Sequence, residues 1–112
     1  MKKIDILENL LNNKENELND IFVRAYFDSI DYKKEMLDFD GVIWEKEIAE
    51  IVENCKMFGI KEFTVSSGYT DIAKTLFEFE KKGCKLEGLV EIKIYKRFKK
   101  DFEKKVAFKM SL

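Results

Sequence analysis

Histidine and proline are both absent from the 112 residues of this chain. Without histidine, the chain lacks the commonest metal ligand of proteins and the side chain that most readily acts as a general base near neutral pH. Without proline, it has no rigid linker and no PxxP docking segment. We therefore expect no catalytic residues, no metal and no cofactor, and we predict a protein that is not an enzyme.

Cysteine is scarce, and long apolar runs are missing. The two cysteines, Cys55 and Cys84, are expected to be reduced, buried thiols of a cytosolic protein rather than a disulfide. No apolar run approaches the roughly 18 residues of a membrane span. The N-terminal segment has acids among its apolar residues and no small-residue cleavage site, unlike a signal peptide. We expect a cytoplasmic protein, in the host cell cytosol, with no membrane partner.

Charge is plentiful, but the two signs are unevenly distributed. Charged residues make up 38% of the chain, and 21 basic against 22 acidic side chains give a net charge of −1. Residues 1–62 carry nine basic and 15 acidic side chains, a net of −6, whereas residues 93–112 carry eight basic and two acidic ones, a net of +6. Such separation creates fields that steer binding partners.

The length predicts one domain over residues 1–112, with a helical N-terminal part over 1–36. Apolar residues at helical spacing predict a short helix over 4–12 and a longer one over 15–36, followed by a turn over 37–41. A third helix is predicted over 43–58. Its expected core-facing stripe consists of Trp44, Ile48, Ile51, Val52, Cys55 and Phe58.

The pattern then changes to alternation, which predicts strands over 60–66, 88–94 and 105–112, with one helix between the first two. Ser67 is the predicted cap of that helix, and Gly83 its end. A strand, helix, strand order predicts a parallel pair, and the last strand should run antiparallel to the second. We expect one core that includes Val90, Ile92, Val106 and Phe108. The predicted class is α/β (α+β): N-terminal helices, then helix-β-α-β-β over 43–112 with a small three-stranded mixed sheet.

Four segments carry a resemblance to a known group of proteins. They are DFDGVIW at 38–44, EFTVSS at 62–67, FEKKGCKLEGL at 79–89 and the closing KMSL at 109–112. With these, roughly the last 70 residues resemble a family of short uncharacterised proteins of Firmicutes phages and integrative mobile elements. Members often have a proline near the last strand, and this chain lacks it. The resemblance implies a mobile-element setting and a small α/β fold, and it implies no catalytic residues.

Two short segments suggest binding chemistry. Ser66, Ser67 and Gly68 lie at a strand-to-helix junction, where anions and other ligands bind in parallel α/β units, although a plain helix cap is the simpler explanation. The run over 93–105 interleaves aromatic and cationic residues, which suits base stacking and phosphate contact. The same run also suits a charged hairpin loop. Its central residues are Lys96, Arg97, Phe98, Lys99 and Lys100.

Acidic residues gather in the middle of the chain and can imitate nucleic acid in a basic groove of another protein. A solvated set of helix faces is the plainer explanation. The predicted partner-binding face comprises Asp28, Asp31, Glu35, Asp38, Asp40 and Glu45. Combined with the resemblance, it leads to the hypothesis of an accessory protein that binds a host protein, such as an anti-CRISPR inhibitor of a defence nuclease complex. The alternatives are a nucleic-acid-binding protein using loop 93–105 and a homodimeric structural module.

Overall fold

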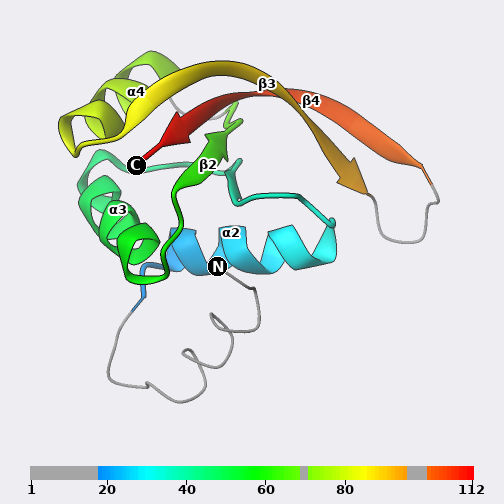
Figure 1. Ribbon diagram of the computed structural model, residues 1–112, viewed down its shortest axis with the longest axis horizontal. Helices are drawn as coiled ribbons and strands as arrows, with labels where there is room; N and C mark the ends of the chain where they lie inside the picture. The colour runs from blue at the N-terminus through cyan, green and yellow to red at the C-terminus, as the bar shows by residue number, and fades with distance from the viewer. Residues whose placement is uncertain (1–17, 69–70, 96–100) are drawn as a thin grey trace.

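Three α-helices, one short 3-10 helix and four strands make up the described part of the chain, residues 18–68, 71–95 and 101–112 of a computed structural model (Figure 1). In chain order the elements are α2 Asp20–Asp31, β1 Asp38–Phe39, η1 Glu45–Glu47, α3 Ile48–Met57, β2 Glu62–Val65, α4 Ile72–Lys81, β3 Lys85–Tyr95 and β4 Phe102–Ser111. The predicted α/β (α+β) class is confirmed, although the sheet has four strands instead of three. The predicted helix over 4–12 lies outside the described residues.

The strands form one mixed sheet in the order β1-β2-β4-β3. β1 is parallel to β2, and β4 is antiparallel to both β2 and β3. The antiparallel pairing of the last two strands is therefore confirmed. β2 and β3 run in the same direction, as predicted, but they are not neighbours, because β4 returns between them. The central place suits β4, since Ala107 and Met110 lie on opposite faces of it and both are buried.

One face of the sheet, which we call the helix face, packs against the helices. Phe39 of β1, Phe63 of β2 and Phe79 of α4 form an aromatic cluster with ring centroids 5.2 to 6.4 Å apart. α3 packs beside α4, and Phe22 of α2 stacks on Phe58 at 5.7 Å. These rings are a large part of the core, because each buried ring removes a large apolar area from water.

The opposite face, which we call the loop face, carries Thr64, Lys109 and Ala107, and the loop between α2 and β1 crosses it. That loop is fastened at the sheet edge, where the backbone N–H of Tyr95 donates to the carbonyl of Tyr32 at 3.0 Å. Thr64, Lys109 and Ala107 are polar or small, so this part of the sheet does not need a helix to cover it.

A β-bulge decides which residues of β3 point to which face. Leu86 pairs with Met110 and Gly88 with Lys109, so Glu87 is an extra residue. Gly88 has φ +130, a conformation that favours glycine. Leu86 and Leu89 consequently share the helix face, whereas Val90 and Ile92 turn to the loop face, since they pair with Ala107 and Lys105. The prediction that Val90 and Ile92 share one core face with Val106 and Phe108 is wrong.

The helix boundaries differ from those predicted. α2 ends at Asp31 and not at residue 36, because Lys33 has φ +50 and the chain then leads into β1. The predicted turn over 37–41 contains that strand. Trp44 lies before α3 in extended conformation and is 61% exposed, so the helical spacing that placed it in the core does not apply. Gly59 and Gly83 follow α3 and α4 with positive φ, as helix ends require.

Candidate functional site

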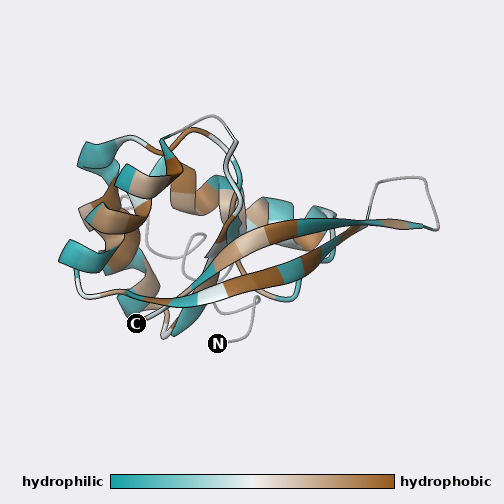
Figure 2. Ribbon diagram, turned by 90° about the horizontal axis from the view of Figure 1, so that it is seen from above, coloured by the Kyte–Doolittle hydropathy of each residue, from teal (hydrophilic) through white to brown (hydrophobic). Residues whose placement is uncertain are grey.

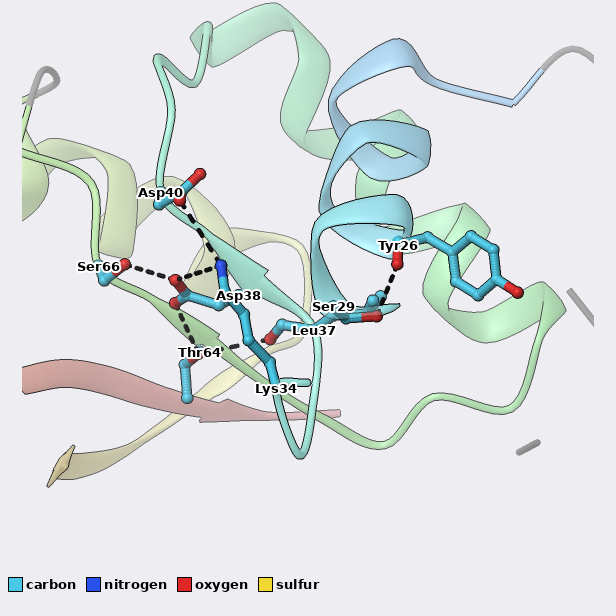
Figure 3. A network of polar contacts seen from close by, with 8 residues as sticks. All are labelled: Tyr26, Ser29, Lys34, Leu37, Asp38, Asp40, Thr64 and Ser66. Carbon is cyan, nitrogen blue, oxygen red and sulfur yellow. Dashed lines mark hydrogen bonds and ion pairs between the residues drawn. The ribbon is translucent and has the colours of Figure 1, made fainter. Parts of the chain in front are cut away.

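A polar network ties β1 to β2 on the loop face (Figure 3). Asp38 is only 1% exposed, and both its carboxylate oxygens accept hydrogen bonds. The hydroxyls of Thr64 and Ser66 donate to Oδ1 and Oδ2, each at 2.6 Å. The Nζ of Lys34, itself buried, lies 3.6 Å from an oxygen of Asp38 and 3.6 Å from one of Asp40. The cost of burying these charges is offset because they are paired.

This network holds a very short strand in place. β1 has two residues, and its backbone bonds to β2 include those from the Thr64 N–H to the Leu37 carbonyl at 2.9 Å and from the Ser66 N–H to the Phe39 carbonyl at 3.1 Å. The side chain of Asp38 adds two further bonds across the same pair of strands. Because the carboxylate is already occupied by hydroxyl donors, the arrangement suits structural support better than chemistry on a substrate.

Ser66, Ser67 and Gly68 follow β2, as predicted, but they do not open the next helix. The N-cap of α4 is Asp71, whose side chain accepts from the backbone N–H of Lys74 at 3.3 Å. The predicted cap role of Ser67 is therefore wrong. A carboxylate already satisfies this helix terminus, and that weakens the case for an anion site there.

Four of the six residues of the predicted acidic face gather around Lys34. Burial and the nearby carboxylate of Asp40 raise the pKa of Asp28 above its usual 3.8, and Asp31 adds to the effect. Asp38 belongs to the same region but lies beneath the surface. A partner could therefore touch Asp28, Asp31 and Asp40, while Asp38 is committed to the interior.

The other two residues of that face lie apart from this group. Glu35 is exposed on the loop between α2 and β1. Glu45 is on η1, where its carboxylate pairs with Lys74 of α4 at 3.1 Å. The acidic face as a binding surface stays a prediction. Its accessible members are Asp28, Asp31 and Asp40 of the first group, together with Glu35 on the loop.

Cys55 and Cys84 are buried free thiols, as predicted. Burial raises the pKa of Cys55 to about 12 and that of Cys84 to about 11, so both stay protonated and weakly nucleophilic at neutral pH. Within residues 18–68, 71–95 and 101–112, no group of three carboxylates or thiols is arranged to hold a metal ion. None of the described helices is long and apolar enough to cross a membrane.

The β3–β4 hairpin continues beyond β2 and projects from the body of the protein (Figure 2). We call this part, residues 89–95 with 101–107, the arm. On its helix face Leu89 is 64% exposed, Val106 is 61% exposed and Phe102 is exposed as well. Helices α3 and α4, of ten residues each, extend only ~15 Å, whereas the 11-residue strand β3 spans ~36 Å. The helices are too short to cover the whole sheet, so apolar side chains of the arm remain uncovered.

Charged and aromatic residues complete the helix face of the arm. Glu91 pairs with Lys104 at 3.5 Å, and the Nζ of Lys93 lies 4.9 Å from the ring centroid of Phe102. The Tyr95 ring lies 5.4 Å from the same ring. In total, three acidic residues offset three lysines in the described arm. The described strands of the arm therefore mix apolar side chains with charges of both signs, as protein-binding surfaces do, while residues 96–100 add four basic side chains to the same segment of the sequence.

The predicted nucleic-acid residues Lys96, Arg97, Phe98, Lys99 and Lys100 lie outside the described residues. The alternation over 105–112 predicts that Val106 is buried, and this prediction is wrong. The signal that could have revealed its exposure is the length of the strand compared with the predicted helices. For Leu89, the signal is Gly88 directly before it, since glycine within a strand often marks a bulge.

The comparison with known families decides the classification. The family model of a domain of unknown function, DUF7698, matches residues 21–112. The chain is a member of the DUF7698 family. The match includes every helix of the described chain apart from the first residue of α2, and all four strands. Neither a curated protein nor a solved structure matches this DUF7698 chain.

Proposed function

We propose that this DUF7698 protein acts by binding another protein, and that the helix face of the arm is its main contact surface. The observation that carries the proposal is the exposure of Leu89, Val106 and Phe102 together on one projecting face. Contiguous exposed apolar side chains with a charged rim are typical of interaction sites. The partner is expected in the host cytosol. Inhibition of a host defence complex, as by an anti-CRISPR, is the finer form of this proposal and is supported by the resemblance to mobile-element proteins.

Affinity capture from nuclease-treated host lysate, followed by reconstitution with the purified captured protein, tests the proposal. The arm variant is Leu89→Ser with Val106→Ser. Its matched control is Met57→Ser with Phe77→Ser, which changes two exposed apolar residues of α3 and α4. The arm variant should bind at least about tenfold more weakly than the control, the size of one hot-spot loss. Equal affinity of the two variants would rule out the arm.

A second candidate function, binding of nucleic acid, has one observation in its favour. Lys93, Tyr95 and Phe102 form a cluster of one cation and two rings, and in the sequence they flank the segment KRFKK. Such clusters stack bases and contact phosphates. A gel shift at low salt tests it with Arg97→Glu, Lys99→Glu and Lys100→Glu combined, which should abolish a salt-sensitive complex. The control reverses Lys81, Lys82 and Lys85, three exposed lysines elsewhere.

A further inference from the structure

The outer edge of β3 has open backbone groups between the bulge and the arm end. The N–H of Tyr95 points away from β4, because it donates to the carbonyl of Tyr32. Backbone groups alternate in direction along an antiparallel strand, so those of Leu89, Glu91 and Lys93 point outward as well. Within the described part of the chain, these three residues form no backbone hydrogen bond outside the β3–β4 ladder. An edge of this kind is a template for another strand.

The pairing at the other side of β4 gives the same assignment. The N–H groups of Thr64 and Ser66 point to β1, so Phe63 and Val65 are the residues of β2 that exchange bonds with β4. Following the alternation across β4 makes Val90 and Ile92 the residues of β3 that bond to β4. The outward direction of Leu89, Glu91 and Lys93 therefore follows from two separate sets of hydrogen bonds.

A cavity of about 230 Å³ reaches this edge from the loop face. Glu91 and Lys93 border it, although their side chains are held on the helix face by Lys104 and by the ring of Phe102. The strand edge is therefore part of the cavity wall. The residues that line it from the loop and from the loop face are Lys34, Glu35, Met36, Asp38, Thr64, Val90, Ile92 and Lys109.

We propose that an extended segment of the partner protein adds as a strand beside Leu89, Glu91 and Lys93, and that one of its side chains enters this cavity. The inference rests on the proposed protein-binding function and specifies its mode. Partner residues opposite Glu91 and Lys93 exchange main-chain hydrogen bonds, and the residue between them, opposite Ile92, points to the loop face. In this mode main-chain bonds give affinity, and the cavity gives specificity.

The residues of the edge define the chemistry of the segment. The cavity walls contributed by Val90, Ile92 and Met36 are apolar, so the entering side chain is of the valine or isoleucine type. Its two neighbours face Glu91 and Lys93 across the new strand pair, where opposite charges are favourable. For an antiparallel segment this gives the order Glu-Val-Lys.

A second copy of β3 fits this edge poorly. If two copies pair antiparallel about the centre of the open stretch, the two Glu91 carboxylates lie directly opposite each other, which is unfavourable. If one strand slides by two residues so that Glu91 faces Lys93, the Leu89 of the other copy lies opposite Tyr95, where Tyr32 already occupies the edge. The partner is therefore a different chain.

Amide exchange with a synthetic peptide, Thr-Glu-Val-Lys-Thr, tests the mode on the unchanged protein. At millimolar peptide, exchange of the outward amides of Glu91 and Lys93 should slow. The amides of Val90 and Ile92 bond to β4 in the free protein and should show little change, and the outward amide of Leu89 lies beyond the end of the peptide. Absence of slowing at both Glu91 and Lys93 would overturn the proposal.

A matched pair of variants at one position tests the mode with the captured partner. Glu91→Pro and Glu91→Ala both remove the carboxylate, but only proline removes the outward N–H, and proline is tolerated at such edge positions. Glu91→Pro should bind the partner roughly five- to tenfold more weakly than Glu91→Ala, the loss of one hydrogen bond. A thermal melt shows whether each variant folds. If Glu91→Pro does not fold, the peptide experiment on the unchanged protein decides.

The outcomes separate this inference from the function on which it rests. If the two Glu91 variants bind equally while Leu89→Ser with Val106→Ser binds weakly, the edge mode is wrong and the proposed function stands. If none of these variants changes binding, both are wrong. A dimer of the unchanged protein in light scattering that Glu91→Pro dissociates would make a second copy the occupant and would also overturn the proposal.

Discussion

Strands β3 and β4 behave differently at their two ends. At the body end, Met110 is fully buried against the helices, whereas in the arm Val106, on the same face of the same strand, is 61% exposed. Both residues belong to one run of alternating apolar residues. Alternation therefore indicates that a strand exists and which side chains share a face, but the extent of the helical layer decides which of them are buried.

The largest effect on stability is expected from a large-to-small substitution in the core of the body. Phe63 is fully buried between Phe39 and Phe79, so Phe63→Ala should lower the free energy of unfolding by about 3–5 kcal/mol. Val106→Ala in the arm should change it by less than about 0.5 kcal/mol. Urea denaturation of both variants measures the contrast. A cost above about 2 kcal/mol for Val106→Ala would mean that the arm is covered in solution.

A smaller effect is expected from the polar network. Asp38→Ala removes one partner of buried Lys34 and leaves two hydroxyls without their acceptor. Loss of one member of a buried pair costs about 3–5 kcal/mol, and the remaining carboxylate of Asp40 should reduce this to about 2–3 kcal/mol. Asp40→Ala is the control, with an expected cost below about 1 kcal/mol because Asp40 is partly exposed. Equal costs in thermal unfolding would contradict the assigned role of Asp38.

The smallest effect concerns Asp28 and depends on pH. Burial raises its pKa in the folded state, so the folded chain binds more protons than the unfolded chain at pH values between the two pKa values. The contribution of this group to stability is therefore full below the usual pKa of 3.8 and is lost as the pH rises through the folded pKa.

Asp28→Asn should accordingly raise stability at pH 7 by up to about 0.5 kcal/mol and give no gain at pH 3. Denaturation curves at both pH values measure the difference. Asp20→Asn is a control, because Asp20 lies in the first turn of α2, where a negative charge is favourable. A gain for Asp28→Asn that persists at pH 3 would show that its cause is not the carboxylate charge.

The sequence predicted the helices and the three longer strands because their periodic patterns and glycine ends are local signals. β1 could not be found in this way, since two residues carry no period, and the strand exists through its bonds to Thr64 and Ser66. The insertion of β4 between β2 and β3 is equally nonlocal, because it depends on which edges meet after the chain folds. Trp44 was misplaced because α3 begins at Ile48, five residues later than its pattern indicated.

The candidate sites were harder to predict than the fold. The acidic face was predicted from acidic residues that lie close together in the sequence. In the structure the side chain of Asp38 is buried, and the carboxylate of Glu45 pairs with Lys74. The sequence pattern predicted the exposed apolar residues of the arm to be buried, because apolar residues in an alternating strand usually indicate a core. Exposure depends on what neighbouring elements fail to cover, and that is a property of their relative lengths.

The bulge at Glu87 has a consequence for how this family can tolerate insertions and deletions. It adds one residue to β3 and so reverses the parity with which all later residues of the strand alternate. Deleting that single residue would exchange the two faces of β3 within the arm, while β4 keeps its own faces. Leu89 and Glu91 would then point to the loop face, away from Val106 and Lys104. Length variation is therefore expected in the connecting loops. Between Cys84 and Tyr95, only a change by an even number of residues would keep the side chains of β3 on their present faces.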